Sequence, residues 1–137
     1  MKSTSNIEKA KVILCNHALA LVNGDFNYAS DKKGIIPLME FIERDIMRGG
    51  SIVDKVVGRA AAFLMLYGGV KEVHAVVISE GACEVFDKFN LPYSYDKKVS
   101  YISNRMNDGQ CPMEEAVIGI DVPEVAYEVL KQKLNNI

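Results

Sequence analysis

The sequence predicts an α/β fold, a mixed sheet with helices on both faces, from three observations. Residues 18–22 and 26–29 are short extended runs joined through Asn23-Gly24, which is a strong local signal for a β-hairpin. Residues 73–78 are almost continuously apolar, as is typical of a strand covered on both faces. Helical patterns separate these strands, and a hairpin followed by alternating helices and strands favours a mixed sheet in an α/β sandwich.

Three helical patterns lie in the first half of the chain. Residues 6–17 carry apolar positions among Lys and Glu. Residues 35–46 are amphipathic, and Pro37 is compatible with this helix only in its first turn. Residues 60–67 are rich in alanine and apolar on all sides, so we expect this helix to be central and buried.

The segment between Gly50 and the central helix is less regular. Residues 51–53 indicate a short strand or approach segment, and residues 54–59 lead into the helix. After the apolar strand, Ser79-Glu80-Gly81 opens a further helix, and residues 93–95 are a plausible third short strand.

The C-terminal part is predicted to hold a turn and two helices. Residues 99–106 are ambiguous, and residues 107–110 have the composition of a turn. Cys111-Pro112 starts a short helix, since proline is favoured at the first helical position. Asp121 caps the last predicted helix, with Glu124 three residues later as in a capping box. Its predicted buried stripe consists of Val122, Val125, Ala126, Val129 and Leu130.

Length and composition limit the classes of protein to which this chain can belong. The length of 137 residues fits a single domain, 1–137, with 49% apolar and 25% charged residues. The net charge of −2, from 16 basic and 18 acidic side chains, gives no electrostatic reason to expect nucleic acid or an anionic membrane as partner. The longest apolar run, residues 60–67, is far shorter than the roughly 20 residues that cross a bilayer. Without a signal-peptide pattern, we expect a cytoplasmic protein.

The cysteines and histidines do not form a familiar framework. Cys15, Cys83 and Cys111 are an odd number at irregular spacing, so free thiols are expected. His17 and His74 lie in different predicted elements, and the usual Cys and His spacings of a zinc site are not present. We therefore expect neither a metal nor a cofactor. His74, within the apolar strand, is expected to be a hydrogen-bonded core or edge histidine.

The first candidate site consists of Asp54, Lys55 and Arg59. On one helix, Lys55 and Arg59 are four residues apart and would share a face that could hold one anion. If they stand at the helix start, free backbone N–H groups would add to that positive field. The structural alternative is an Asp cap beside two solvated or salt-bridged cations.

The second candidate site is built on Cys111 and Glu114. A thiol just ahead of a helix N-terminus is favoured as thiolate, and Glu114 at about the third helical position would cap the helix or carry a proton. The alternative is an ordinary cap with an inert cysteine. Asn104 and Arg105 are weaker additions that fit an ordinary polar surface equally well.

A third group lies where the apolar strand ends. Ser79, Glu80 and Cys83 follow this strand, and ligands of open α/β sheets bind near strand ends. A single cysteine there is more often a small core residue than a nucleophile.

Several motifs together resemble those of a known family. They are residues 54–62 (DKVVGRAAA), residues 69–73 (GVKEV), Ser79-Glu80 and residues 111–114 (CPME). The combination resembles an uncharacterised microbial family of unknown function that is assigned a cytidine-deaminase-like fold. The resemblance spans residues 18–130 and implies a three-layer α/β/α sandwich around a mixed sheet with an early hairpin.

The resemblance does not bring the deaminase chemistry with it. Zinc deaminases carry His or Cys followed by Ala-Glu on one helix, and Pro-Cys-x-x-Cys on the next. Here the first position has Asp54-Lys55, and the second has only Cys83 where two cysteines are needed. Three protein ligands and an open position cannot be assembled, so zinc-dependent deamination is not expected.

Two functional hypotheses of different classes follow. In the first, the protein is a binder of an anionic, nucleotide-like small molecule or a zinc-independent enzyme. Its site would comprise Asp54, Lys55, Arg59 and Cys111, with Glu114 in catalysis and Ser79, Glu80, Asn104 and Arg105 in binding. In the second, it is a catalytically silent module that oligomerises or docks a partner. Tyr93, Tyr95 and Tyr101, in or beside an expected edge strand, favour a homodimer under either hypothesis.

Overall fold

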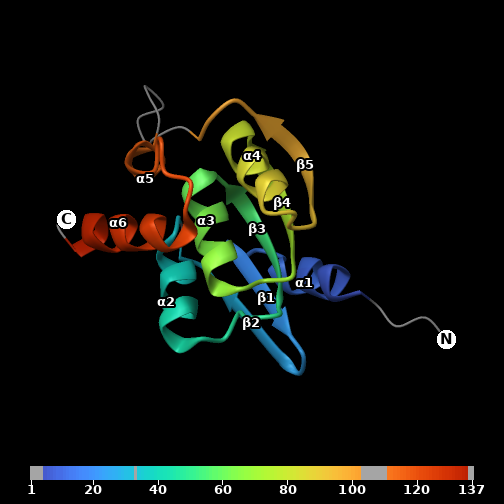
Figure 1. The fold of residues 1–137 in the computed structure, drawn as a ribbon. Coiled ribbons are helices and arrows are strands. Elements are labelled where there is room, and N and C mark those ends of the chain that lie inside the picture. The colour runs from blue at the N-terminus through green and yellow to red at the C-terminus, as the bar shows by residue number, and fades with distance from the viewer. Residues whose placement is uncertain (1–4, 33, 103–110, 136–137) are drawn as a thin grey trace.

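Five strands form one mixed sheet in the order β2-β1-β3-β4-β5 in a computed structural model that describes residues 5–32, 34–102 and 111–135 (Figure 1). The strands are β1 (Leu19–Asn23), β2 (Phe26–Ser30), β3 (Ser51–Val57), β4 (Glu72–Ser79) and β5 (Tyr93–Val99). The helices are α1 (Asn6–Leu14), α2 (Ile36–Arg44), α3 (Arg59–Gly68), α4 (Glu80–Lys88), α5 (Pro112–Ala116) and α6 (Pro123–Asn135).

The sheet combines a hairpin with a parallel unit. Strands β1 and β2 pair antiparallel, as the sequence predicts, and Gly24 takes the positive φ of 62° that the turn between them requires. Strand β3 pairs antiparallel with β1, whereas β4 and β5 run parallel to β3. The crossover helices α3 and α4 connect these parallel strands, so the carboxyl ends of β3, β4 and β5 lie at one edge of the sheet.

Helices cover the two faces unequally. On one face, α3 lies between α2 and α4, and α6 packs on α3 from outside (Figure 1). The main core lies on this side, and residues Ala60 to Met65 of α3 are all buried in it, which confirms the predicted central helix. On the other face, α1 packs on β1 and β3 through Ala10 and Leu14.

Three predictions about local structure are wrong. Residues 54–57 belong to β3 and not to a helix, because the β-branched residues around them pair in register with β4. Arg59 is the first residue of α3, so Lys55 and Arg59 do not share a helix face. Helix α1 ends at Leu14 and not at residue 17, and Cys15 after it is exposed.

The predicted buried stripe of the last helix is partly wrong. Ala126 and Leu130 are buried as expected, together with Tyr127. Val122 and Val125, however, are 49% and 48% exposed, because α6 turns its Ala126 and Tyr127 side toward α3. The stacking of Tyr127 on Tyr67 of α3, with ring centroids 4.5 Å apart, fixes this orientation.

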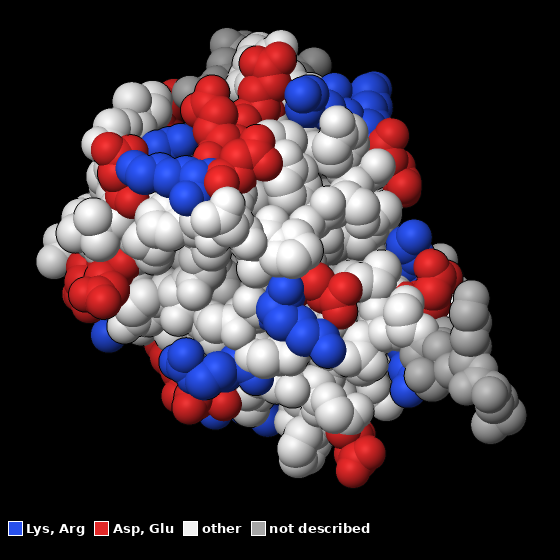
Figure 2. All heavy atoms as spheres, turned by 45° about the vertical axis from the view of Figure 1, so that its right-hand side comes forward, with Lys and Arg blue, Asp and Glu red and all other residues white. Residues whose placement is uncertain are grey.

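Charges of both signs lie interspersed among apolar and neutral residues on the face drawn in Figure 2. No single sign of charge dominates this side of the described molecule. Within the described ranges, none of the helices is both long and apolar enough to cross a membrane.

Candidate functional site

The N-terminus of α3 is occupied by the Glu114 carboxylate. Glu114 Oε1 accepts a hydrogen bond from Arg59 N at 2.6 Å, and Oε2 accepts one from Ala60 N at 2.7 Å. These are two of the N–H groups that a helix start leaves without an intrahelical partner. Glu114 therefore caps α3, a helix more than fifty residues earlier in the chain, and not its own helix α5.

A glycine makes room for this carboxylate. Gly58 is the N-cap residue of α3 and has no side chain with which to cap the helix. A Cβ atom at this position would collide with the carboxyl group of Glu114. The Gly58 and Glu114 positions of the two sequence motifs are thus matched to each other in space.

The Arg59 side chain contacts the segment that follows α5. Its Nη2 donates to Ile120 O at 2.8 Å, and its Nε lies 3.4 Å from Val117 O. Nη1 lies 3.8 Å from Glu84, and Nη2 lies 3.7 Å from Asp121. The guanidinium is therefore surrounded by two carbonyl oxygens and two carboxylates, and a ligand anion would have to compete with all four.

Burial and capping act on the pKa of Glu114 in opposite directions. Loss of hydration raises the pKa of this carboxyl group, whereas the N–H groups of Ala60 and Arg59 and the Arg59 charge lower it. Burial is the larger effect, so the pKa lies above its ordinary value.

Asp54 is a second buried carboxylate, in the middle of the sheet. Its side chain is 7% exposed; Oδ1 lies 3.4 Å from Val56 N, and Oδ2 has no hydrogen-bond partner among the described residues. Burial raises the pKa of Asp54 to about 7, and the backbone N–H groups of Val56 and Lys55 offset only part of this increase.

The remaining candidate residues are dispersed. Lys55 is exposed on β3. Ser79 is buried and caps α4, its Oγ accepting from Ala82 N at 3.0 Å, while Glu80 is exposed in the first turn of α4. Cys111 is half-buried at the N-cap of α5, without a side-chain cap bond, and Asn104 and Arg105 lie outside the described residues.

Of the predicted site, the structure thus unites Arg59 with Glu114 in direct contact. Cys83 is buried in α4, as a small core residue would be, and Cys111 is three residues before Glu114. Among the described residues, no group of three or more His, Cys, Asp or Glu side chains could hold a metal ion.

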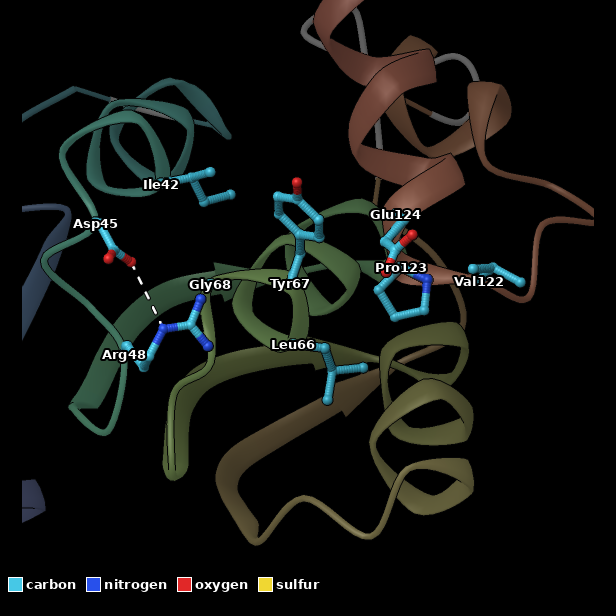
Figure 3. Close-up of a pocket in the computed structure, with 9 residues that line it drawn as sticks. All are labelled: Ile42, Asp45, Arg48, Leu66, Tyr67, Gly68, Val122, Pro123 and Glu124. Carbon is cyan, nitrogen blue, oxygen red and sulfur yellow. Dashed lines mark ion pairs between the residues drawn. The ribbon is translucent and has the colours of Figure 1, made fainter.

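A groove lies at the opposite end of α3, at residues that the sequence analysis did not identify as a site. Its volume is about 580 Å³, and it opens between α2, the last turn of α3 and the start of α6 (Figure 3). This volume falls within the roughly 300–1,000 Å³ of small-molecule sites. The lining residues are Ile42, Asp45, Arg48, Leu66, Tyr67, Gly68, Val122, Pro123 and Glu124.

The groove is lined by both apolar and charged side chains. Figure 3 shows Tyr67 between Ile42 on one side and Glu124 on the other. Asp45 and Arg48 lie on the same side of the groove as Ile42 (Figure 3). Arg48 Nε lies 3.6 Å from Asp45, and both of these side chains are largely exposed, at 69% and 73%. A pair this exposed contributes roughly 0–1 kcal/mol, so Arg48 can exchange Asp45 for another anion at little cost.

Residues 9–134 match the family model described as TM1506, a domain of unknown function (DUF1893). This chain belongs to that family. A crystal structure of a DUF1893 family protein (TM1506) from Thermotoga maritima is similar to it, with a TM-score of 0.85 and 27% sequence identity. The match covers 100% of this chain and 93% of the Thermotoga chain. No curated protein matches the sequence.

Membership of this family supports the α/β class and leaves the function open. Neither the family description nor the name of the Thermotoga protein mentions an activity or a ligand.

Proposed function

We propose that this protein binds a small organic anion in the groove between α2, α3 and α6. The observation that carries the proposal is the groove itself, about 580 Å³ in volume, in which Leu66 and Tyr67 lie beside the cationic side chain of Arg48. Ligand sites are concave and fix the orientation of the ligand through a few placed polar groups.

The groove fits this function better than the start of α3 does. At the start of α3, Glu114 already accepts from Arg59 N and Ala60 N, and the Arg59 guanidinium has partners of its own. At the groove, Arg48 has only the exposed ion pair with Asp45 among the described residues. The anionic ligand expected from the sequence is therefore proposed at Arg48 and not at Lys55 and Arg59.

The lining also suggests how the ligand would lie. A flat apolar body would contact Tyr67, Leu66 and Pro123, with its carboxylate, sulfonate or phosphate directed to Arg48. Glu124 at the other side of the groove would repel a second anion and accept a hydrogen bond from a donor group.

The test uses anilinonaphthalene sulfonate, a probe with a flat apolar body and one anionic group. Its fluorescence titration with the native protein should be saturable at one site. Arg48→Gln should weaken binding about 5-fold, which corresponds to the loss of one exposed charge interaction. Val122→Trp, at a half-exposed lining position, should fill the groove and remove binding.

Arg44→Gln is the matched control, because Arg44 is exposed at the end of α2 but does not line the groove. Equal binding by the native protein and all three variants would refute the groove as the site. Native mass spectrometry of the purified protein would then search for a ligand bound elsewhere.

A silent module that forms homodimers is the second candidate. It is favoured by the exposure of Tyr95 on the edge strand β5 and of Tyr101 just after it. Light scattering at micromolar concentration should report a dimer that Tyr95→Ser weakens, and a strict monomer would refute this candidate.

We also propose that the fold is related to that of the cytidine deaminases. The mixed sheet, the early hairpin and the helices on both faces agree with the architecture that the motif resemblance implies. Superposition of an experimental structure on zinc deaminases tests it: a different strand order or a different helix placement would exclude the relation.

A further inference from the structure

Three polar side chains lie close together across β4 and β5, and two of them, His74 and Ser94, are hydrogen-bonded. His74 on β4 lies directly opposite Ser94 on β5 in the parallel register. His74 Nδ1 lies 2.7 Å from Ser94 Oγ, and His74 Nε2 lies 3.2 Å from Asp96 Oδ1. Ser94 and Asp96 are two residues apart on β5, so both point to the same side of the sheet.

The nearby carboxylate favours one direction for the bond between His74 and Ser94. An ionised carboxylate can only accept, so Asp96 favours the tautomer that carries its ring proton on Nε2. In that neutral tautomer Nδ1 is the acceptor, and the Ser94 hydroxyl donates its proton to it. A serine that donates to a histidine oriented by a carboxylate has the arrangement of an activated nucleophile.

The roles match those of a Ser-His-Asp triad, with the ring turned around. In the best-known triads Nε2 faces the serine and Nδ1 faces the aspartate. Here the two nitrogens are exchanged: Nδ1 is hydrogen-bonded to the serine, and Nε2 lies 3.2 Å from the aspartate. The arrangement is defined by geometry and roles and not by position in the sequence.

The three residues differ in exposure, and Asp96, at 62% exposed, is more open to solvent than the buried aspartate of the best-known triads. His74 is only 4% exposed, so the surrounding strands hold its ring in place. Ser94 and Asp96 are exposed on the last strand of the sheet order. Helix α1, which covers this face elsewhere, packs on β1 and β3 and leaves Ser94 accessible to a reactant.

We propose that Ser94, His74 and Asp96 form a nucleophilic site that accepts an acyl group from an activated carboxylic ester. Ser94 Oγ forms a bond to the carbonyl carbon while its proton moves to His74 Nδ1. The bond from that carbon to the leaving oxygen breaks, and the proton passes from Nδ1 to the leaving oxygen. The products are the Ser94 acyl ester and the free alcohol or phenol, with no oxidation or reduction.

This site is distinct from the groove between α2, α3 and α6, since none of its three residues lines that groove. The proposal does not depend on the proposed function.

The test is acetylation of the folded protein by p-nitrophenyl acetate, followed by peptide mass spectrometry. Ser100, exposed just beyond the end of β5, serves as an internal reference for an ordinary hydroxyl. General-base assistance is typically worth about 10²–10⁴-fold, so we expect Ser94 to be acetylated at least about 100-fold faster than Ser100. Ser94→Ala should remove the fast phase of p-nitrophenol release, and Ser100→Ala should leave it unchanged.

Variants of Asp96 and His74 show whether Ser94 reacts fast because it is activated or only because it is exposed. Asp96→Asn, at an exposed position, should slow acetylation of Ser94 about 10-fold without changing the rate at Ser100 or the unfolding midpoint. Asp96→Glu should recover part of the rate. His74→Gln should reduce the acetylation rate of Ser94 to that of Ser100. The circular dichroism of this variant, compared with that of the native protein, checks that it folds.

If the buried His74→Gln variant does not fold, the native protein and Asp96→Asn still decide the question. Equal rates at Ser94 and Ser100 in the native protein would overturn the proposal. A fast rate at Ser94 that Asp96→Asn leaves unchanged would also overturn it.

Discussion

Two buried carboxylates, Glu114 and Asp54, show how differently one molecule can hold the same chemical group. Burial raises the pKa of both, to about 7 for Asp54. Each oxygen of Glu114 accepts a backbone N–H, whereas Oδ2 of Asp54 has no partner among the described residues. Ionisation therefore costs free energy at both sites, and hydrogen bonds from the backbone offset more of this cost at Glu114 than at Asp54.

The difference arises from the elements that face each group. A helix N-terminus presents N–H groups without intrahelical partners, and its dipole favours negative charge. A strand in the middle of a sheet, such as β3 between β1 and β4, uses its N–H groups in the ladders on either side. The supply of free donors thus decides how much of the cost of burying an ionised carboxylate is offset.

The largest expected effect is that of Glu114→Ala. It leaves two N–H groups of α3 without partners and removes the link from α5 to α3, so we expect a loss of about 2–4 kcal/mol in the free energy of unfolding. Urea denaturation measures it. Glu115→Ala, at the exposed neighbouring position on α5, is the control and should cost less than about 0.5 kcal/mol. Equal effects of the two substitutions would contradict the capping role.

The next effect is that of Gly58→Ala. The added methyl group would push the Glu114 carboxylate away from Arg59 N and Ala60 N, at a cost of about 1–3 kcal/mol. The same change in the Glu114→Ala background should cost much less, since the carboxylate is no longer present. A double-mutant cycle of unfolding free energies checks this, and strict additivity would show that the two positions are independent.

Asp54→Asn should act in the opposite direction, stabilising the protein by about 1–2 kcal/mol at pH 8. The pKa of an aspartate carboxyl group, ordinarily 3.8, rises to about 7 for Asp54 in the folded state, so between these pH values the folded state keeps a proton that the unfolded state has lost. Stability of the native protein therefore falls as the pH rises from about 4 to 7, by linkage.

The difference between the native protein and Asp54→Asn isolates this effect, because Glu114 titrates in both. The gain from Asp54→Asn should be near zero at pH 4 and reach its full value above pH 7. Thermal unfolding at a series of pH values measures it, and a gain that does not change with pH would be inconsistent with a buried, ionising Asp54.

The smallest effect is expected for Glu84→Gln. Its carboxylate lies 3.8 Å from Arg59 and is 76% exposed, so the pair contributes less than about 0.5 kcal/mol. A larger loss would mean that Arg59 depends on this carboxylate more than on the carbonyl oxygens of Val117 and Ile120.

Local patterns predicted the elements whose signals are local. The hairpin around Asn23-Gly24, the central alanine-rich helix and the start of α4 at Ser79 all appear as predicted. The interpretation of residues 54–57 as a segment leading into a helix was wrong. Val53, Val56 and Val57 are β-branched residues that favour a strand. That signal, with Gly58 as the break after it, could have located the end of β3.

The candidate residues were found more readily than their partners. Glu114 was expected to cap its own helix or carry a proton, and Arg59 was expected to share a face with Lys55. Both interpretations rest on spacing within a few residues, whereas the observed partners are 55 and 61 positions away. The groove at Arg48 and the Ser94–His74–Asp96 group are formed by separate elements, so no single stretch of sequence indicates either.

The sequence by itself determined the α/β class, the early hairpin and the burial of the central helix. Turn chemistry, helix propensity and apolar periodicity act over a few residues and can be recognised there. Only the tertiary structure decided that Glu114 caps α3, that His74 lies between Ser94 and Asp96, and that the end of α3 opposite Glu114 opens into a groove. These outcomes depend on strand register and helix packing, which bring together groups from distant parts of the chain.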